Sequence, residues 1–134
     1  MKYWLLKSEP DAWSWDDQVK EGPSMWDGVR NYQARNNLAK MRLGDKCFFY
    51  HSVTQKAIVG IVKVVKESYP DPTDNTKKFL AINVKALMRL RNPVTLNQIK
   101  ENKQLYNIAL IKQSRLSVMP ITKLQWNTIY KMSL

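Results

Sequence analysis

The sequence predicts a mixed α/β (α+β) domain built around a curved, mostly antiparallel sheet. Stretches rich in Val, Ile, Phe and Tyr occupy the middle of the chain at 46–51, 56–67 and 78–89, and they predict three long strands. In the last third, capping-box patterns begin at Thr95 and Thr122. There a threonine oxygen and a glutamine three residues later satisfy free backbone N–H groups, so the patterns predict the starts of two short helices.

The first third of the chain predicts one buried strand and one short helix. Residues 2–7 form an almost continuous apolar run, which is typical of a strand buried on both faces. Pro10 ends this strand because it has no N–H for a ladder. Residues 14–21 predict a helix with Asp16 and Asp17 in its first turn, where carboxylates suit the helix dipole.

The next segment combines an aromatic ring, a turn glycine, guanidinium groups and several amides. Gly28 permits a positive φ, so we expect a loop that leads into a helix at about 31–41. The turn around Gly44 ends this helix. Further along, the composition predicts a polar loop at 69–76 and a short strand at 114–120 that is stopped by a proline.

The charge of the chain favours a polyanionic partner. Lys and Arg number 22 against 11 Asp and Glu, which leaves a formal net charge of +11. Nucleic acid is the usual partner of a small domain with such a charge. The alternatives are a basic surface that serves only solubility, and an acidic membrane face.

Length and cysteine usage point to a simple cytosolic protein. The single cysteine, Cys47, cannot form an internal disulfide, which fits a reducing compartment. The start of the chain has no signal-peptide pattern, and no apolar run is long enough to span a bilayer. We therefore expect one domain over residues 1–134, monomeric, cytoplasmic and without a membrane partner.

The sequence predicts no catalytic constellation, metal site or cofactor. His51 is the only histidine, and no serine or cysteine lies in a nucleophile-elbow or protease pattern. One histidine and one cysteine offer no pair of metal ligands at a useful spacing. The four glycines form no phosphate-binding loop, so nucleotide cofactors are not indicated.

Trp26 is the aromatic residue that we expect to contact a ligand. It lies beside Gly28 in a polar segment before a helix, where a ring can stack on a flat base. Trp126, by contrast, belongs to an apolar pattern at a helix start and is expected in the core. Tyr32 and Tyr50 fit either role.

Several segments together are similar to those of a known family. The chain resembles the EVE domain family over almost its full length. The matching segments are 3–10 (YWLLKSEP), 26–36 (WDGVRNYQARN), 44–45 (GD), 48–52 (FFYHS), 60–61 (GI), 69–72 (YPDP) and 114–118 (SRLSV).

The resemblance implies a PUA-like fold, which is a small, partly open β-barrel flanked by short helices. It also implies a pocket for a modified base, with modified cytosine in DNA as the ligand most often attached to the family. Carried over position by position, the base-pocket residues are Lys7, Ser8, Trp26, Arg30, Asn31, Tyr32, Tyr50, His51, Ser114, Arg115, Leu116 and Ser117.

The first functional hypothesis is a non-catalytic reader of a modified nucleobase. In this hypothesis Trp26 and a tyrosine stack on the base, while Asn31, Ser8 and Ser117 hydrogen-bond its edge. The nearby Arg30 either contacts phosphate at the rim of the pocket or holds the loop in place.

Two other hypotheses remain. One is a hydrolase that acts on a modified nucleoside with Lys7, Glu9 or His51 as acid and base. The other is a general RNA-binding protein of the PUA-like kind. In both nucleic-acid hypotheses, Arg35 and Arg42 are expected to contact phosphate.

Overall fold

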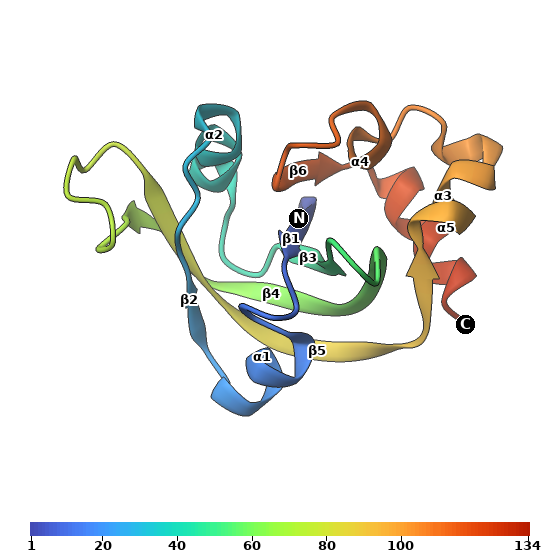
Figure 1. Cartoon of the computed structure of the whole chain (residues 1–134), viewed down its shortest axis with the longest axis horizontal. Coiled ribbons are helices and arrows are strands. Elements are labelled where there is room, and N and C mark those ends of the chain that lie inside the picture. The colour runs from blue at the N-terminus through green and yellow to red at the C-terminus, as the bar shows by residue number, and fades with distance from the viewer.

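The computed structural model describes all residues from 1 to 134 and shows one strongly curled sheet with helices packed around it (Figure 1). The strands are β1 (Tyr3–Ser8), β2 (Ser24–Trp26), β3 (Lys46–His51), β4 (Ala57–Pro70), β5 (Leu80–Thr95) and β6 (Val118–Ile121). The helices are α1 (Trp15–Glu21), α2 (Tyr32–Lys40), α3 (Leu96–Glu101), α4 (Ala109–Lys112) and α5 (Lys123–Met132), with a 3₁₀ turn at Lys103–Leu105.

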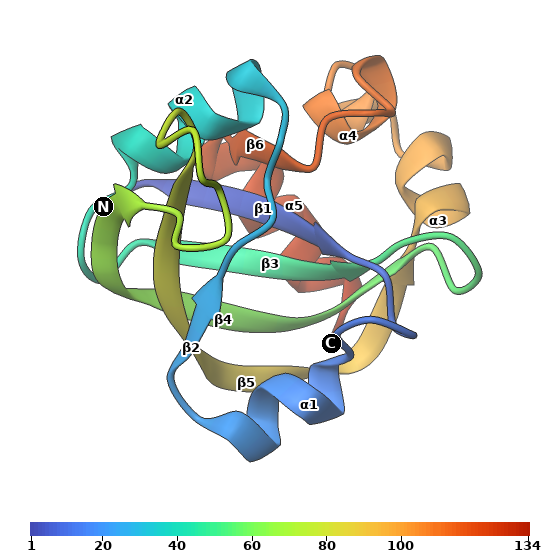
Figure 2. The ribbon, with the colours of Figure 1, turned by 60° about the vertical axis from the view of Figure 1, so that its left-hand side comes forward.

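The six strands follow the order β2-β5-β4-β3-β1-β6 in a single sheet. The strands β3, β4 and β5 pair antiparallel in this order, as expected; β4 and β5 are long, whereas β3 has 6 residues. The first strand lies inside the sheet, parallel to β3 and antiparallel to β6. At one edge β2 pairs only with β5, to which it runs antiparallel (Figure 2). The sheet therefore curls without closing, which confirms the expected curved and mostly antiparallel architecture.

The core fills both faces of the central strand β3. On one face, Phe48 stacks on Trp126 of α5 with ring centroids 3.8 Å apart. On the other face, Phe49 meets Trp15 of α1 and Trp26 of β2 edge-to-face at 5.4 and 5.5 Å. Burial of these rings contributes to the hydrophobic stabilisation of the fold. The contacts of Phe49 also bring α1 and β2 to the same face of β3.

A glycine in β4 makes room for α1. A Cβ atom at Gly60 would lie 2.4 Å from the ring of Trp15, so only glycine allows this close approach. The register of β4 against β5 shifts between Ile58 and Gly60. The start of α1 is fixed further by a capping box between Ser14 and Asp17. Together these contacts position the segment that leads from β1 into α1.

Helix starts were predicted well because their capping residues are local in sequence. Thr95 and Thr122 each form the expected capping box, and Asn31 caps α2. Ser14 is the cap of α1, so that helix begins one residue later than expected. The longest helix, α5, has 10 residues, and no helix combines the length and apolar character needed to cross a membrane.

Strand ends were predicted less well because pairing partners decide them. β5 extends to Thr95, beyond the expected end at 89, and β4 extends to Pro70, beyond 67. The extra end of β5 pairs with the start of β4, and the extra end of β4 pairs with the start of β5. The last strand begins at Val118 and not at 114. The short elements β2 and α4 were not expected at all.

Candidate functional site

A cavity of about 710 Å³ opens between the end of β1 and the edge strand β2, where the sheet does not close. This volume lies within the range of small-molecule and base-sized sites. Its walls come from the end of β1, the loop before α1, the segment around β2, and the residue before β6. The lining residues are Lys7, Ser8, Glu9, Ala12, Trp13, Glu21, Pro23, Ser24, Met25, Trp26, Asp27, Gly28, Val29, Arg30 and Ser117.

Two polar residues at the end of β1 fasten the neighbouring loops. The ammonium group of Lys7 donates to the carbonyl oxygen of Ser114 at 2.7 Å, and the backbone N–H of Lys7 donates to the carbonyl oxygen of Ser117 at 2.9 Å. The hydroxyl of Ser8 donates to the carbonyl oxygen of Trp13. Partial burial lowers the pKa of Lys7 below its ordinary value. The end of β1 therefore organises two walls of the cavity.

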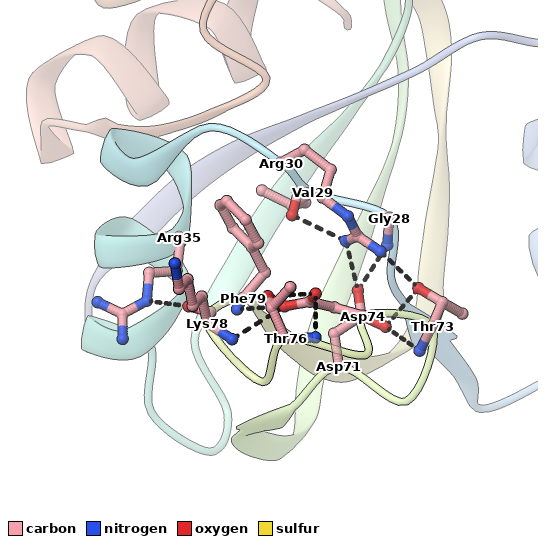
Figure 3. Close-up of polar contacts among 10 residues, drawn as sticks. All are labelled: Gly28, Val29, Arg30, Arg35, Asp71, Thr73, Asp74, Thr76, Lys78 and Phe79. Atoms are coloured by element: carbon pink, nitrogen blue, oxygen red, sulfur yellow. Dashed lines mark hydrogen bonds and ion pairs between the residues drawn. The ribbon is translucent and has the colours of Figure 1, made fainter.

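The buried carboxylate of Asp71 holds the loop after β2 (Figure 3). It is 2% exposed and accepts hydrogen bonds from the N–H of Gly28 at 2.8 Å and of Thr73 at 2.8 Å. It also pairs with the guanidinium of Arg30 at 3.1 Å. Burial acts to raise the pKa of Asp71, but hydrogen bonds from Thr73, Gly28 and Arg30 outweigh it and keep the pKa below its usual value.

The structure therefore gives Arg30 a largely structural role. Besides Asp71, its guanidinium donates to Thr73 at 3.0 Å and lies 5.5 Å from the ring centroid of Phe79. Its charge is balanced by the carboxylate, although its side chain remains 41% exposed at the rim of the cavity. Of the two roles that the sequence left open for Arg30, holding the loop is the one that these contacts support.

The lining of the cavity is more acidic than the rest of the chain. Glu9, Glu21 and Asp27 line it, and none of these carboxylates takes part in either of the chain's two ion pairs. Because Asp71 balances Arg30, the remaining cation is Lys7. A phosphate group would meet three carboxylates here, so the cavity favours an uncharged ligand that carries hydrogen-bond donors.

Two tryptophans line the cavity, one from β2 and one from the loop before α1. Trp26 is only 8% exposed and packs edge-to-face on Phe49, so most of its ring belongs to the core. Trp13 is half-buried, and its indole N–H donates to Gln18 at 2.9 Å. The more accessible ring is thus Trp13.

Five of the residues predicted for the base pocket line the cavity. They are Lys7, Ser8, Trp26, Arg30 and Ser117. They come together from β1, from β2 and its following loop, and from the residue before β6. The loop before α1, with Glu9 and Trp13, adds a wall that the pocket prediction lacked.

Four other predicted pocket residues lie outside the lining. The Asn31 side chain caps α2 by accepting from the N–H of Ala34 at 2.9 Å. Tyr32 is 57% exposed and stacks on Phe79 at 5.0 Å. Tyr50 and Leu116 are buried in the core at 3% and 4% exposure.

The last three predicted pocket residues also lie outside the lining. His51 uses both ring nitrogens, since Nε2 accepts from the N–H of Trp15 at 3.0 Å and Nδ1 lies 2.6 Å from Gln55 Oε1. Ser114 supports the site through its carbonyl oxygen, which accepts from Lys7. Arg115 is exposed in the same loop.

The two predicted phosphate contacts lie on α2 and just after it, away from the cavity lining. Arg35 donates to the carbonyl oxygen of Lys78 at 2.9 Å. Arg42 donates to the carbonyl oxygens of Ala39 and Met41 at 3.3 and 3.2 Å, which satisfies groups at the end of the helix. Both side chains thus have local partners.

The sequence did not reveal Trp13, Asp27 and Met25 as lining residues. It also did not reveal that Asp71 accepts a hydrogen bond from Gly28 and so holds the loop after β2. Asp27 is adjacent to Trp26 and could have been included on that ground. Asp71 lies 41 residues from Arg30 in the chain, so no local pattern reveals their contact. No three His, Cys, Asp or Glu side chains gather in a way that could hold a metal ion.

The open six-stranded sheet, the short flanking helices and the cavity at its gap define a small α+β domain of the PUA-like kind. The pattern of the EVE domain family matches residues 2–132, and the chain belongs to that family. This confirms the resemblance predicted from its segments.

Relatives with known structures share the whole fold. A Rhodopseudomonas palustris protein, whose NMR structure is known, is 47% identical, with a TM-score of 0.94 over 99% of this chain and 93% of that one. Human THYN1 protein, crystallised in complex with 5-methylcytosine containing DNA, is 30% identical, with a TM-score of 0.92 over 99% of this chain and 98% of that one. Mouse thymocyte nuclear protein 1 is 36% identical over 95% of this chain and 71% of its own length.

Proposed function

We propose that this protein binds DNA and reads a modified cytosine, which it holds as a single extruded or unpaired base in the cavity between β1 and β2. The observation that carries the proposal is its kinship with human THYN1, which shares 30% of residues across the whole domain and was crystallised with 5-methylcytosine containing DNA. The cavity supplies the chemistry that such a ligand needs.

The size and walls of the cavity suit one base. Its volume of about 710 Å³ accommodates a base and part of its sugar. Trp13 offers a ring for stacking, and Val29 and Met25 offer apolar contact for a methyl group. Ser117 and Lys7 supply hydrogen-bond donors in the lining.

The unpaired carboxylates favour a base with an exocyclic amine. Cytosine presents an N4 amine, and aspartate or glutamate accepts its hydrogen bonds, whereas thymine presents a carbonyl at the same position. Asp27 lies beside Trp26 and has no ion-pair partner in the protein. We assign Asp27 the role of accepting from N4 and Lys7 that of donating to the base carbonyl.

Affinity must also come from outside the cavity. Extruding a base from a duplex costs a few kcal/mol. Stacking returns about 1 to 3 kcal/mol per base, so phosphate contacts with the basic surface have to supply the remainder. The net charge of +11 is consistent with this division.

A titration of matched oligonucleotides tests the proposal. DNA strands and duplexes with 5-methylcytosine, cytosine or thymine at one position are titrated at about 50 and about 200 mM salt, with RNA of the same sequence in parallel. We expect the methylcytosine DNA to bind most tightly and all affinities to fall steeply with salt. Equal affinity for the three bases would contradict base reading and leave a general nucleic-acid binder.

A separate measurement of turnover tests the hydrolase hypothesis. Lys7 and Glu9 both line the cavity, whereas His51 does not. Mass analysis of modified nucleosides and oligonucleotides after incubation should recover them intact if the protein is a reader. Turnover that disappears in Glu9→Gln would support the enzyme hypothesis instead.

A further inference from the structure

A second, cationic depression lies at the opposite end of β1. It consists of two adjoining hollows of about 350 and 380 Å³ that share Lys2 and Lys40 in their walls. We call it the cationic groove. Besides Met1, its lining residues are Lys2, Tyr3, Trp4, Ala39, Lys40, Arg42, Asn37, Asp45, Pro120, Ile121 and Lys123.

The groove carries positive charge that the protein does not neutralise. Lys2, Lys40, Arg42 and Lys123 are all exposed, and none of them belongs to either of the chain's two ion pairs. The groove contains one carboxylate, that of Asp45, which is 3% exposed. The charge balance is therefore opposite to that of the cavity.

Asp45 is already occupied by donors from the protein. It accepts from the backbone N–H of Lys2 at 3.1 Å, from the indole N–H of Trp4 at 3.1 Å and from the backbone N–H of Arg42 at 3.0 Å. These bonds draw the start of β1 and the end of α2 together. The ammonium groups of Lys2 and Lys40 are left free to bind an external anion.

The same two strands connect the groove with the cavity. Tyr3 and Ser8 lie at the two ends of β1, one in each depression, and β6 begins beside Ser117 of the cavity and ends at Ile121 of the groove. Five steps along a strand span about 17 Å. Phosphates on one strand of B-DNA follow at about 3.4 Å along the axis, so this span corresponds to about five nucleotides of duplex.

We propose that the cationic groove binds the phosphodiester backbone of the same DNA whose base occupies the cavity, about five nucleotides to one side. This rests on the proposed function. The groove then anchors the DNA through charge, while the cavity selects the base. The ligand class is a polyanionic backbone, because four cations surround the hollows and the single carboxylate is saturated.

The test uses three duplexes of about 24 base pairs, each with one 5-methylcytosine. The modified base lies at the centre of the first duplex, about three pairs from the 5′ end of the second and about three pairs from the 3′ end of the third. The double variant Lys40→Gln/Lys123→Gln breaks no hydrogen bond in the structure. Affinity is measured against salt for wild type and variant on each duplex. We expect the slope of log K against log salt to fall by about 1.8 in the variant on the central duplex.

One of the two end-placed duplexes should behave differently. On that duplex the DNA ends before it reaches the groove, so wild type and variant should bind it with the same affinity and the same salt slope. Equal slopes for wild type and variant on the central duplex, or an equal reduction on all three duplexes, would overturn the proposal. Adding Arg42→Gln should lower the central slope further.

A matched variant controls for loss of net charge. Lys100→Gln/Lys103→Gln removes two exposed lysines on α3 and the following 3₁₀ turn, which lie far from the N-terminus in Figure 2. It should leave the slope unchanged, and an equal reduction would contradict a groove-specific contact. The same titrations with unmodified duplex show whether wild type prefers methylcytosine. A missing preference would refute the reader function, whereas the slope difference still reports on the groove.

Discussion

The two depressions at the ends of β1 have opposite chemistry although they share two strands. The cavity has three unpaired carboxylates and one unbalanced cation, whereas the groove has four cations and one saturated carboxylate. A protein with a net charge of +11 would be expected to show basic character in both. Under the proposed function, selection and attraction of the nucleic acid are separate tasks placed about 17 Å apart.

Each depression is supported by one buried aspartate that gathers N–H groups from distant segments. Asp71 draws the loop after β2 to the β4–β5 turn, and Asp45 draws the start of β1 to the end of α2. The two carboxylates lie in separate hydrogen-bond networks, so a substitution can disrupt one depression and leave the other intact.

The largest expected effect comes from Asp45→Ala. The change leaves the buried indole N–H of Trp4 and two backbone N–H groups without their acceptor, and it should lower the free energy of unfolding by about 3 kcal/mol. Denaturant unfolding measures this. The salt slope of DNA binding should also fall, while the ratio of affinities for methylated and unmodified DNA stays the same.

Asp71→Ala should disturb the cavity instead. Its partners Gly28, Arg30 and Thr73 are partly exposed and can regain water, so we expect a smaller loss of about 2 kcal/mol in the free energy of unfolding. The preference for methylcytosine should weaken and the salt slope should stay the same. A variant with unchanged preference would show that the Gly28 loop does not form part of the binding site.

Low pH should weaken the hydrogen-bond networks of both buried aspartates. The pKa values of Asp45 and Asp71 lie below their usual range, because hydrogen bonds that favour the charged carboxylate outweigh burial. Their stabilisation is present above the unfolded pKa of about 3.9 and is lost as pH falls through the lower folded pKa. Unfolding measured at about pH 6 and about pH 2.5 should show that the difference in stability between wild type and Asp71→Ala is smaller at the lower pH.

Asp27→Asn should change base discrimination by the cavity without affecting the fold. The discrimination between cytosine and thymine should fall by about 1 to 3 kcal/mol, because an amide can also donate to the thymine carbonyl. Competition titration measures this. Asp11→Asn makes the same charge change at an exposed position outside the cavity lining and should leave discrimination intact.

The smallest effect is expected outside both depressions. Lys46, Lys63 and Lys85 lie directly opposite one another on three adjacent strands. Like charges in this register repel, so Lys63→Gln should raise the free energy of unfolding by about 0.2 to 1 kcal/mol. Base preference should not change, and a large loss of preference would contradict the assignment of reading to the cavity.

The sequence alone predicted those parts of the fold that local patterns determine. The caps at Thr95 and Thr122 were correct because each capping box lies within four residues. The apolar run that became β1 was also placed correctly inside the sheet. The parallel pairing of β1 with β3 and the edge strand β2 were not predicted, because long-range pairing decides them.

The candidate site was predicted in part for the same reason. Lys7, Ser8 and Ser117 followed from the family resemblance and line the cavity. Tyr50 has the right type for a ligand contact, but its neighbours bury it, which no composition argument reveals. His51 likewise serves the start of α1 through a backbone N–H that lies 36 residues away.

The β4–β5 turn offers a way to change the cavity from outside its lining. The carboxylate of Asp74 accepts from the backbone N–H groups of Thr76, Lys78 and Phe79, each at 2.9 Å, and its pKa of about 2 keeps it charged. This self-contained turn carries Asp71 to the loop at Gly28. If the proposed function holds, grafting the turn from another family member should change ligand preference while every cavity-lining residue stays as it is.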